Sequence, residues 1–235
     1  MRRARELIRS KFPDGINLIQ PSDSLEINRE IYDYEAYTIY RNIKSEDIVF
    51  DVGASVGIFT LKAAKKANFV IAVEPDPYNY NLLLRNIKNN KLENILPIQK
   101  ALSNFVGQSD LEVGSSSFYS TISLQKISPK LTSRRKYGKY DMKIVVDVTT
   151  IDEIVESENI ERVDFIKIDA EGAELEIIEG ANKTIDENNG VYLSVAAEHY
   201  EYQPIEIIKY LSKKGFKCLG KYFESQHSWH VYASR

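Results

Sequence analysis

Residues 49–60 read VFDVGASVGIFT, and residues 69–75 read FVIAVEP. The first apolar run ends in Asp51, and a turn with two glycines leads into a pattern typical of a helix. The second apolar run ends in the acidic Glu74. An acidic residue about twenty positions after the first glycine binds ribose hydroxyls in doubly wound folds. Together the two stretches predict a strand–turn–helix–strand unit that holds a nucleotide.

The turn differs from the pattern that binds dinucleotides. That pattern is G-x-G-x-x-G, and Ser55 stands where its middle glycine would be. A pyrophosphate binds bare backbone N–H groups at a helix N-terminus, and the carboxylate of Asp51 would repel it. S-adenosylmethionine carries an ammonium and a sulfonium group but no phosphate, so the same carboxylate would attract it. The turn therefore favours S-adenosylmethionine, and the alternative is a tight turn that binds nothing.

The composition indicates one compact domain. The chain has 235 residues, 43% of them hydrophobic, and its formal net charge of -3 argues neither for a nucleic acid nor for an acidic partner. No uninterrupted apolar segment approaches the roughly 20 residues that span a bilayer. The basic residues 1–9 favour a solvated amphipathic helix over a signal peptide. The single cysteine, Cys218, excludes an internal disulfide framework and favours a cytoplasmic location.

Strand and helix patterns alternate over residues 46–235. Strands are expected at 47–52, 69–74, 95–100, 163–168, 191–197, 216–223 and 228–233, and helices at 57–67, 77–89, 203–214 and after Gly172. The alternation predicts an α/β fold, a Rossmann-like doubly wound and mostly parallel seven-stranded sheet. Its last two strands should pair as an antiparallel hairpin. Residues 1–45 carry helix and turn signals and should form an N-terminal cap over the active site.

One segment, residues 114–142, interrupts the alternation. It begins with glycine and serines and continues with tyrosines and the basic residues Lys126, Lys130, Arg134, Arg135, Lys136 and Lys139. A long irregular insert in a compact domain is either a functional loop or disordered. We expect a lid over the active site or a solvated loop. RNA binding is disfavoured, because the chain as a whole is not basic.

The ends of the predicted strands supply the candidate site residues. In open α/β sheets, ligands bind outside the carboxyl ends of the strands. The residues expected to contact the cofactor there are Asp51, Gly53, Ala54, Ser55, Gly57, Glu74, Pro75, Ala101, Leu102 and Asp169. So many charges at one edge exceed what folding needs, because burying a charge is costly unless it is paired or used.

Three acidic residues and one histidine at this edge, Asp169, Glu171, Glu198 and His199, allow three interpretations. They could be general bases that take a proton from a nucleophile. They could ligate a divalent metal, since carboxylates with one imidazole suit Mg²⁺ or Mn²⁺. Asp169 or Glu171 could instead only cap the helix that follows. Asp169, Glu171 and His199 are our catalytic candidates, and no metal ligand is predicted.

Several of these stretches resemble the FkbM family of methyltransferases. They are DVGASVG at 51–57, EP at 74–75, ALS at 101–103, TID at 150–152 and KIDAEGAE at 167–174. The resemblance spans about residues 45–200, and the last block is its most specific part. The family's turn usually carries Asn where this chain has Ser55. The resemblance implies a methyltransferase that uses S-adenosylmethionine and often acts on a hydroxyl of a sugar or natural product.

The function hypothesis is therefore O-methylation of a sugar, glycan or other polyhydroxylated small molecule. We expect this acceptor between the insert and four tyrosines whose rings could stack on sugars, Tyr32, Tyr34, Tyr37 and Tyr40. The alternative is that the tyrosines only pack in the core. One rival function is an NAD-dependent oxidoreductase, which Ser55 and Asp51 disfavour. The other is a non-catalytic nucleotide-binding or RNA-binding protein. No nucleic-acid partner is expected.

Overall fold

A seven-stranded sheet forms the centre of the molecule, with strand order β12-β13-β11-β10-β3-β4-β5. The computed structural model describes residues 6–114, 120–122, 140–224 and 227–235. The parallel strands are β3 (Ile48–Val52), β4 (Phe69–Val73), β5 (Ile95–Ile98), β10 (Phe165–Ile168) and β11 (Tyr192–Ala196). An antiparallel hairpin of β12 (Lys217–Phe223) and β13 (Ser228–Ser234) completes it, with β13 antiparallel to β11. The predicted fold class and terminal hairpin are confirmed.

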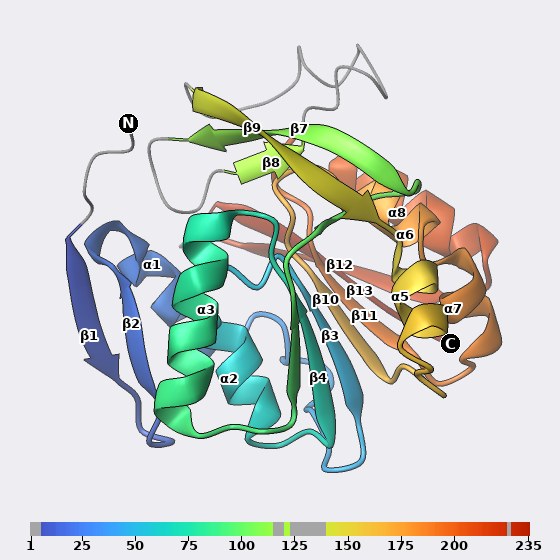
Figure 1. The fold of residues 1–235 in the computed structure, drawn as a ribbon. Coiled ribbons are helices and arrows are strands. Elements are labelled where there is room, and N and C mark those ends of the chain that lie inside the picture. The colour runs from blue at the N-terminus through green and yellow to red at the C-terminus, as the bar shows by residue number, and fades with distance from the viewer. Residues whose placement is uncertain (1–5, 115–119, 123–139, 225–226) are drawn as a thin grey trace.

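Helices cover both faces of this sheet (Figure 1). One face carries α2 (Ile58–Ala64) and α3 (Pro77–Asn90), and the other carries α5 (Ile151–Ser157), α6 (Glu174–Glu179), α7 (Asn182–Glu187) and α8 (Gln203–Lys213). Neighbouring strand residues point to opposite faces, so Phe50 packs in one apolar core and Val49 in the other. Burial on both faces explains why the central strands are almost wholly apolar.

The order of the strands fixes where a ligand can bind. From β3 the chain continues on one side through β4 and β5, and later on the other side through β10 and β11. The carboxyl ends of β3 and β10 therefore meet at a topological switch point, where open α/β sheets bind their ligands.

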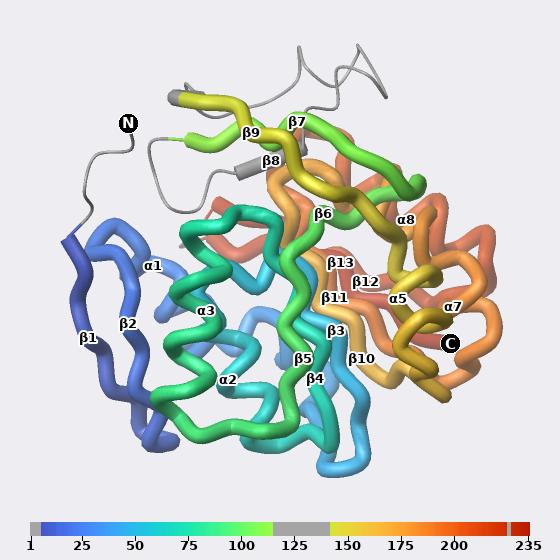
Figure 2. Tube along the Cα trace, in the orientation of Figure 1, coloured from blue at the N-terminus to red at the C-terminus, as the bar shows by residue number. Residues whose placement is uncertain are grey.

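The N-terminal segment begins with a hairpin rather than a helix. It consists of β1 (Leu7–Lys11) and β2 (Asn17–Pro21), followed by the short helical turns η1 (Ser22–Ser24), α1 (Leu25–Asn28) and η2 (Arg29–Asp33). Figure 2 shows β2 beside α3, where the side chain of Asn86 donates to the carbonyl and accepts from the N–H of Ile19. The helix predicted for residues 1–9 is wrong from Leu7 onward, and residues 1–5 lie outside the described residues.

A second sheet, which the sequence analysis did not predict, has the order β6-β9-β7-β8. Its strands are β6 (Ala101–Leu102), β7 (Gly107–Gly114), β8 (Ser120–Ile122) and β9 (Tyr140–Thr149). The segment 114–142 is therefore not irregular at its two ends or at 120–122. Residues 115–119 and 123–139, with the basic cluster, lie outside the described residues.

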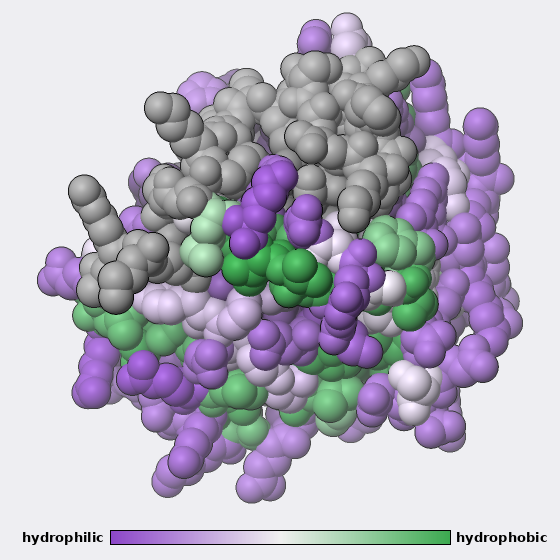
Figure 3. Space-filling view, turned by 45° about the horizontal axis from the view of Figure 1, so that its top comes forward, coloured by the Kyte–Doolittle hydropathy of each residue, from purple (hydrophilic) through white to green (hydrophobic). Residues whose placement is uncertain are grey.

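On the face shown in Figure 3, hydrophobic residues form separate groups among hydrophilic ones.

Within the described residues, none of the helices combines the length and the hydropathy that crossing a membrane requires.

Candidate functional site

A cavity opens at the carboxyl ends of β3, β4 and β10, with about 660 Å³ of empty space that is partly continuous with solvent. Seven of the predicted cofactor-contacting residues line it, namely Gly53, Ser55, Glu74, Pro75, Ala101, Leu102 and Asp169. Two further walls are apolar, with Leu111 from the second sheet and Ile27 from α1. Residues 1–45 thus contribute Ile27 to the cavity wall. Their role as a cap over the active site stays a prediction.

The glycine turn after β3 brings two backbone segments into contact at the cavity. Gly53 has a φ of +72°, and a Cβ there would lie 1.8 Å from the carbonyl oxygen of Asp169. The N–H groups of Gly53 and Ala54 both donate to the carbonyl of Val73, which ties the turn to the end of β4. A side chain at position 53 is thus excluded by both sterics and backbone conformation.

Glu74 is a buried carboxyl group at the tip of β4. Its Oε2 accepts the N–H of Ser55 at 2.8 Å, and its Oε1 accepts the N–H of Asp76 at 2.9 Å. Burial, together with the charge of Asp76, raises the pKa of Glu74 to about 8. A carboxylate has about four lone-pair positions, so two remain for hydroxyl groups of a ligand.

The raised pKa of Glu74 makes a prediction about stability. Glu74 keeps its proton in the folded chain up to about pH 8, whereas in the unfolded chain it releases the proton above about pH 4.5. Raising the pH through this range therefore favours the unfolded chain, so the free energy of unfolding falls until the pH reaches about 8. Glu74→Gln removes the titration but adds a pH-independent cost, because an amide has one acceptor oxygen. Between pH 6 and pH 9, the free energy of unfolding should fall by about 2 to 3 kcal/mol more in the wild type than in Glu74→Gln. Urea unfolding at both pH values measures this, and parallel pH dependences would contradict it.

Asp51 lies beneath the turn rather than in the cavity wall. It is fully buried; its Oδ2 accepts the hydroxyl of Thr60 at 2.5 Å, and its Oδ1 lies 3.1 Å from the Nζ of Lys167. Burial disfavours the ammonium of Lys167, but Asp51 and Asp169 outweigh this effect and raise its pKa. Lys167 also donates to the carbonyl oxygen of Gly53 at 2.9 Å. The ion pair and the hydrogen bond to Gly53 hold the glycine turn in place. The role of Asp51 as a cofactor ligand stays a prediction.

Ala54 and Gly57 do not line the cavity within the part of the chain that the structure describes. Gly57 begins α2 with a φ of +95°, and a Cβ there would lie 2.6 Å from the Cδ1 of Leu83. Both residues therefore shape the turn, and their contact with a cofactor stays a prediction.

The three catalytic candidates converge at the rim of the cavity. Asp169 and Glu171 line it, and His199 lies within 4.0 Å of both, although it is not among the described lining residues. The Nε2 of His199 is 4.0 Å from the Oδ1 of Asp169, and its Nδ1 is 3.9 Å from the Oε2 of Glu171. Glu171 and Gly172 both have positive φ, 55° and 103°, so the backbone turns sharply here. A non-glycine residue in this conformation is commonly found at a functional site.

Glu174 organises this rim, although the sequence analysis did not include it among the site residues. Its Oε1 accepts the N–H groups of Ala170 and Gly172, and its Oε2 accepts the side-chain amide of Gln203. Gln203 in turn accepts the N–H of His199 at 2.9 Å. The signal for Glu174 was its place in the block KIDAEGAE, where the third acidic side chain folds back on the loop that it follows.

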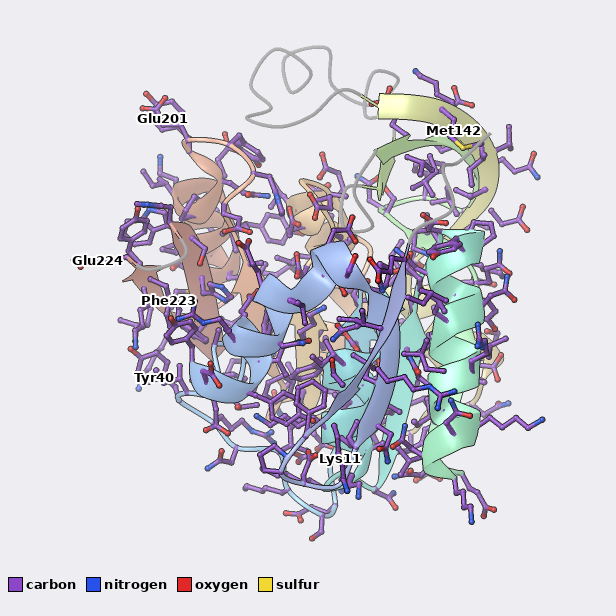
Figure 4. The ribbon with its side chains drawn as sticks, turned by 90° about the vertical axis from the view of Figure 1, so that its left-hand side faces the viewer. Lys11, Tyr40, Met142, Glu201, Phe223 and Glu224 are labelled. Atoms are coloured by element: carbon purple, nitrogen blue, oxygen red, sulfur yellow. The ribbon has the colours of Figure 1, made fainter. Side chains whose placement is uncertain are left out.

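The four N-terminal tyrosines do not form a common stacking surface. Tyr37 is buried and donates its hydroxyl to the Oδ2 of Asp169 at 2.8 Å, whereas the ring of Tyr32 stacks on Phe12. None of the four is among the described residues that line the cavity. Figure 4 shows the exposed Tyr40 on the same side of the molecule as Phe223, and the ammonium of Lys221 lies over both rings. The alternative of structural packing holds for Tyr37 and Tyr32.

Some contacts of the site were not predicted. Asn79 from α3 lines the cavity. The sequence analysis also did not predict that Lys167 donates to the carbonyl of Gly53, or that Tyr37 donates to Asp169. Asn79 and Tyr37 belong to elements that reach the strand ends only through tertiary packing. No local pattern in the sequence marks them.

Comparisons with known proteins agree with this geometry. The family model described as the methyltransferase FkbM domain matches residues 51–218. Methyltransferase sdnD of Sordaria araneosa is 28% identical over 213 residues, which cover 81% of each chain. Hexuronic acid methyltransferase AglP of Haloferax volcanii is 26% identical over 170 residues, which cover 72% of this chain and 63% of that protein.

A solved structure shares the fold. Methyltransferase FkbM from Methylobacillus flagellatus KT superimposes with a TM-score of 0.60 at 19% identity. The match covers 83% of this chain but only 45% of that one, so this chain corresponds to less than half of the solved protein.

Proposed function

This chain belongs to the FkbM family of methyltransferases, and from that membership we propose that it O-methylates a sugar, glycan or other polyhydroxylated small molecule. S-adenosylmethionine supplies the methyl group, as the family implies. The observation that carries the proposal is that Glu74, Asp169 and Glu171 line one cavity. In the proposal Glu74 binds the ribose, and the rim formed by Asp169 and Glu171 promotes loss of the acceptor's proton. The relative AglP, a hexuronic acid methyltransferase, supports a sugar acceptor.

The cavity fits a nucleoside at one end and an acceptor at the other. Glu74 keeps two lone-pair positions for a ribose diol, and the apolar side chains of Leu102, Leu111 and Ile177 offer flat walls for an adenine. Asp169 and Glu171 line the same cavity, and in this proposal the acceptor binds beside them. An acceptor hydroxyl held there would lose its proton at the rim and face the methyl group. Holding two reactants at attack distance can contribute about 7–11 kcal/mol of the rate enhancement.

At pH 9, where the carboxyl group of Glu74 is ionised, Glu74→Ala should weaken the binding of S-adenosylmethionine about 10- to 150-fold. Hydrogen bonds to a charged group are worth about 1.5–3 kcal/mol, and about 1.4 kcal/mol corresponds to a factor of ten. Titration calorimetry measures the dissociation constant, with Glu93→Ala, an exposed residue before β5, as the matched control. Unchanged affinity in Glu74→Ala, or tighter binding of NAD than of S-adenosylmethionine by the wild type, would contradict the assignment of this end of the cavity.

The acceptor can be found by a search that assumes no particular compound. Fractionated small-molecule and glycan extracts are incubated with the protein and isotopically labelled S-adenosylmethionine, and mass spectrometry searches for a newly labelled compound. We expect a label on an oxygen of a polyhydroxylated product. A label found only on RNA or protein, with none on a polyhydroxylated compound, would refute the acceptor class while leaving the methyltransferase activity intact.

The insert has a separate role in this proposal. We expect its basic residues from Lys126 to Lys139 to hold an acidic portion of the acceptor, and these residues lie outside the described residues. The charged group of a hexuronic acid is one such portion. None of the four N-terminal tyrosines is among the described residues that line the cavity. These tyrosines therefore give no support to a sugar as the acceptor.

A further inference from the structure

From the rim geometry we infer that Asp169, Glu171 and His199 form a binding site for a divalent cation of the Mn²⁺ type. The inference rests on the proposed function and specifies how the acceptor hydroxyl is activated. Each of the three side chains offers one ligand atom, and these atoms all lie within 4.8 Å of one another. Glu198, the fourth candidate at this edge, is not one of the three.

The imidazole of His199 is the observation that sets this cluster apart from an ordinary group of acidic side chains. The residue is only 8% exposed, and its Nε2 has no hydrogen-bond partner among the described residues. The nearest carboxylate oxygens lie at 3.5 Å, on Glu174, and at 4.0 Å, on Asp169. These gaps exceed the 2.7–3.2 Å of a hydrogen bond. Leaving a buried polar atom without a hydrogen-bond partner costs about 1–3 kcal/mol. A cation bound to this nitrogen would remove that cost.

The spacing of the three groups suits an octahedral ion. Ligands at about 2.1 Å from such an ion lie about 3.0 Å apart when adjacent and about 4.2 Å apart when opposite. One ligand atom from each of the three side chains lies within 4.8 Å of the other two. These separations are near the distance between opposite ligands, so a single ion between the three groups would draw them closer together.

Hydrogen bonds from outside the cluster hold its ligands in place. Tyr37 donates to the Oδ2 of Asp169, which leaves Oδ1 on the side of His199. On the other side, Gln203 holds the backbone of His199 and is itself bound to Glu174. Such outer partners orient metal ligands and tune their affinity.

The donor set selects the kind of cation. Carboxylates suit Mg²⁺, Ca²⁺ and Mn²⁺, whereas imidazole suits transition metals, and Mn²⁺ accepts both. Three protein ligands leave positions on an octahedral ion for water and for oxygens of the acceptor. The site is thus open on the cavity side, where Asp169 and Glu171 line the wall.

The chemical step can be written in full. A cation held by Asp169, Glu171 and His199 would bind the acceptor hydroxyl oxygen and lower the pKa of that hydroxyl, so that its proton would pass to solvent water. The oxygen then forms a bond to the methyl carbon, while the bond between that carbon and the sulfonium sulfur breaks. The electron pair of the broken bond stays on sulfur and leaves a neutral thioether. No oxidant or further reactant is needed.

Titration with Mn²⁺ alone tests the site, with the free ion followed by electron paramagnetic resonance. The wild type should bind one ion per chain, and Glu171→Gln and His199→Gln should each weaken that binding about tenfold or more. The matched controls are Glu187→Gln and His227→Gln, which replace exposed residues of the same types. Nitrogen modulation of the spin echo from the bound ion should be present in the wild type and absent in His199→Gln.

Binding of S-adenosylhomocysteine to all five proteins verifies that each variant folds. Absence of a saturable site in the wild type overturns the inference, and so does equal Mn²⁺ affinity in the wild type and both rim variants. These readouts need no acceptor, so they are independent of the proposed reaction. Conversely, labelled product that persists in excess chelator would overturn the cation and leave the O-methylation intact. A bound ion without any labelled product from the extracts would count against the O-methylation alone.

Discussion

Replacing Gly53 with alanine should lower the free energy of unfolding by about 4 kcal/mol or more and abolish cofactor binding. Two effects add at this position. The left-handed backbone costs an alanine about 1–2 kcal/mol. The new Cβ would also lie 1.8 Å from the carbonyl oxygen of Asp169, which is backbone and cannot rotate away. Relief of the overlap must separate the ends of β3 and β10, and this separation displaces the rim residue Asp169.

Two other glycines separate these effects. Gly215 has a φ of +84° with nothing within 4 Å of the position that a Cβ would take, and Gly190 has open space without a positive φ. Gly215→Ala should therefore cost about 1–2 kcal/mol, and Gly190→Ala should stay within about 0.5 kcal/mol of the wild type. Denaturant unfolding of the three variants, with and without S-adenosylhomocysteine, gives the comparison. If Gly53→Ala costs no more than Gly215→Ala, the close approach of the two strand ends is not a constraint.

Gly53 also illustrates which parts of the molecule could be predicted from sequence. Adjacent residues determine the turn, the strand before it and the acidic residue after β4. These local features could therefore be predicted from the sequence. The alternation of apolar runs and helix patterns then placed Asp169 and Glu171 at the same sheet edge as Glu74, because parallel strands end together. The structure confirms that edge, with all three residues lining one cavity.

The second sheet was missed although β9 carries a readable pattern. Ile144, Val146 and Val148 point inward while the residues between them are exposed, which is the two-residue period of a half-buried strand. The irregular insert was expected only at residues 114–142, and no strand was predicted at 143–149. In β1, the basic side chains suggested a solvated helix, but the hairpin is fixed by distant contacts such as those of β2 with Asn86.

The support of the rim could not be predicted, because its partners are far apart in the chain. Tyr37 reaches Asp169 across 132 positions, and Lys167 reaches the carbonyl of Gly53 across 114. Asp51 was expected to attract a positively charged ligand, but the structure pairs it with Lys167. A sequence shows which charges lie at a strand end, whereas packing decides which of them neutralise one another.

Glu171→Gln and His199→Gln should each lower kcat for methyl transfer about 10²- to 10⁴-fold while the affinity for S-adenosylmethionine stays within a few-fold. The reason is position: Glu171 lines the cavity after β10 and His199 lies beside it, whereas Glu74 accepts backbone N–H groups of the glycine turn and of the segment after β4. A hydroxyl is a poor nucleophile until it loses its proton, so loss of the group that promotes deprotonation affects the chemical step and not cofactor binding. His227→Gln is the control and should change neither quantity.

The effect of added metal on these variants distinguishes the two ways in which the rim can act. A variant that has lost one ligand of a cation still keeps two, so excess Mn²⁺ should restore part of the lost kcat. A variant that has lost a general base gains nothing from the metal, because no other side chain takes over the proton. We expect partial rescue in Glu171→Gln and in His199→Gln, with kcat measured against Mn²⁺ concentration. Unchanged kcat in both variants, with chelator also harmless, would contradict both roles of the rim.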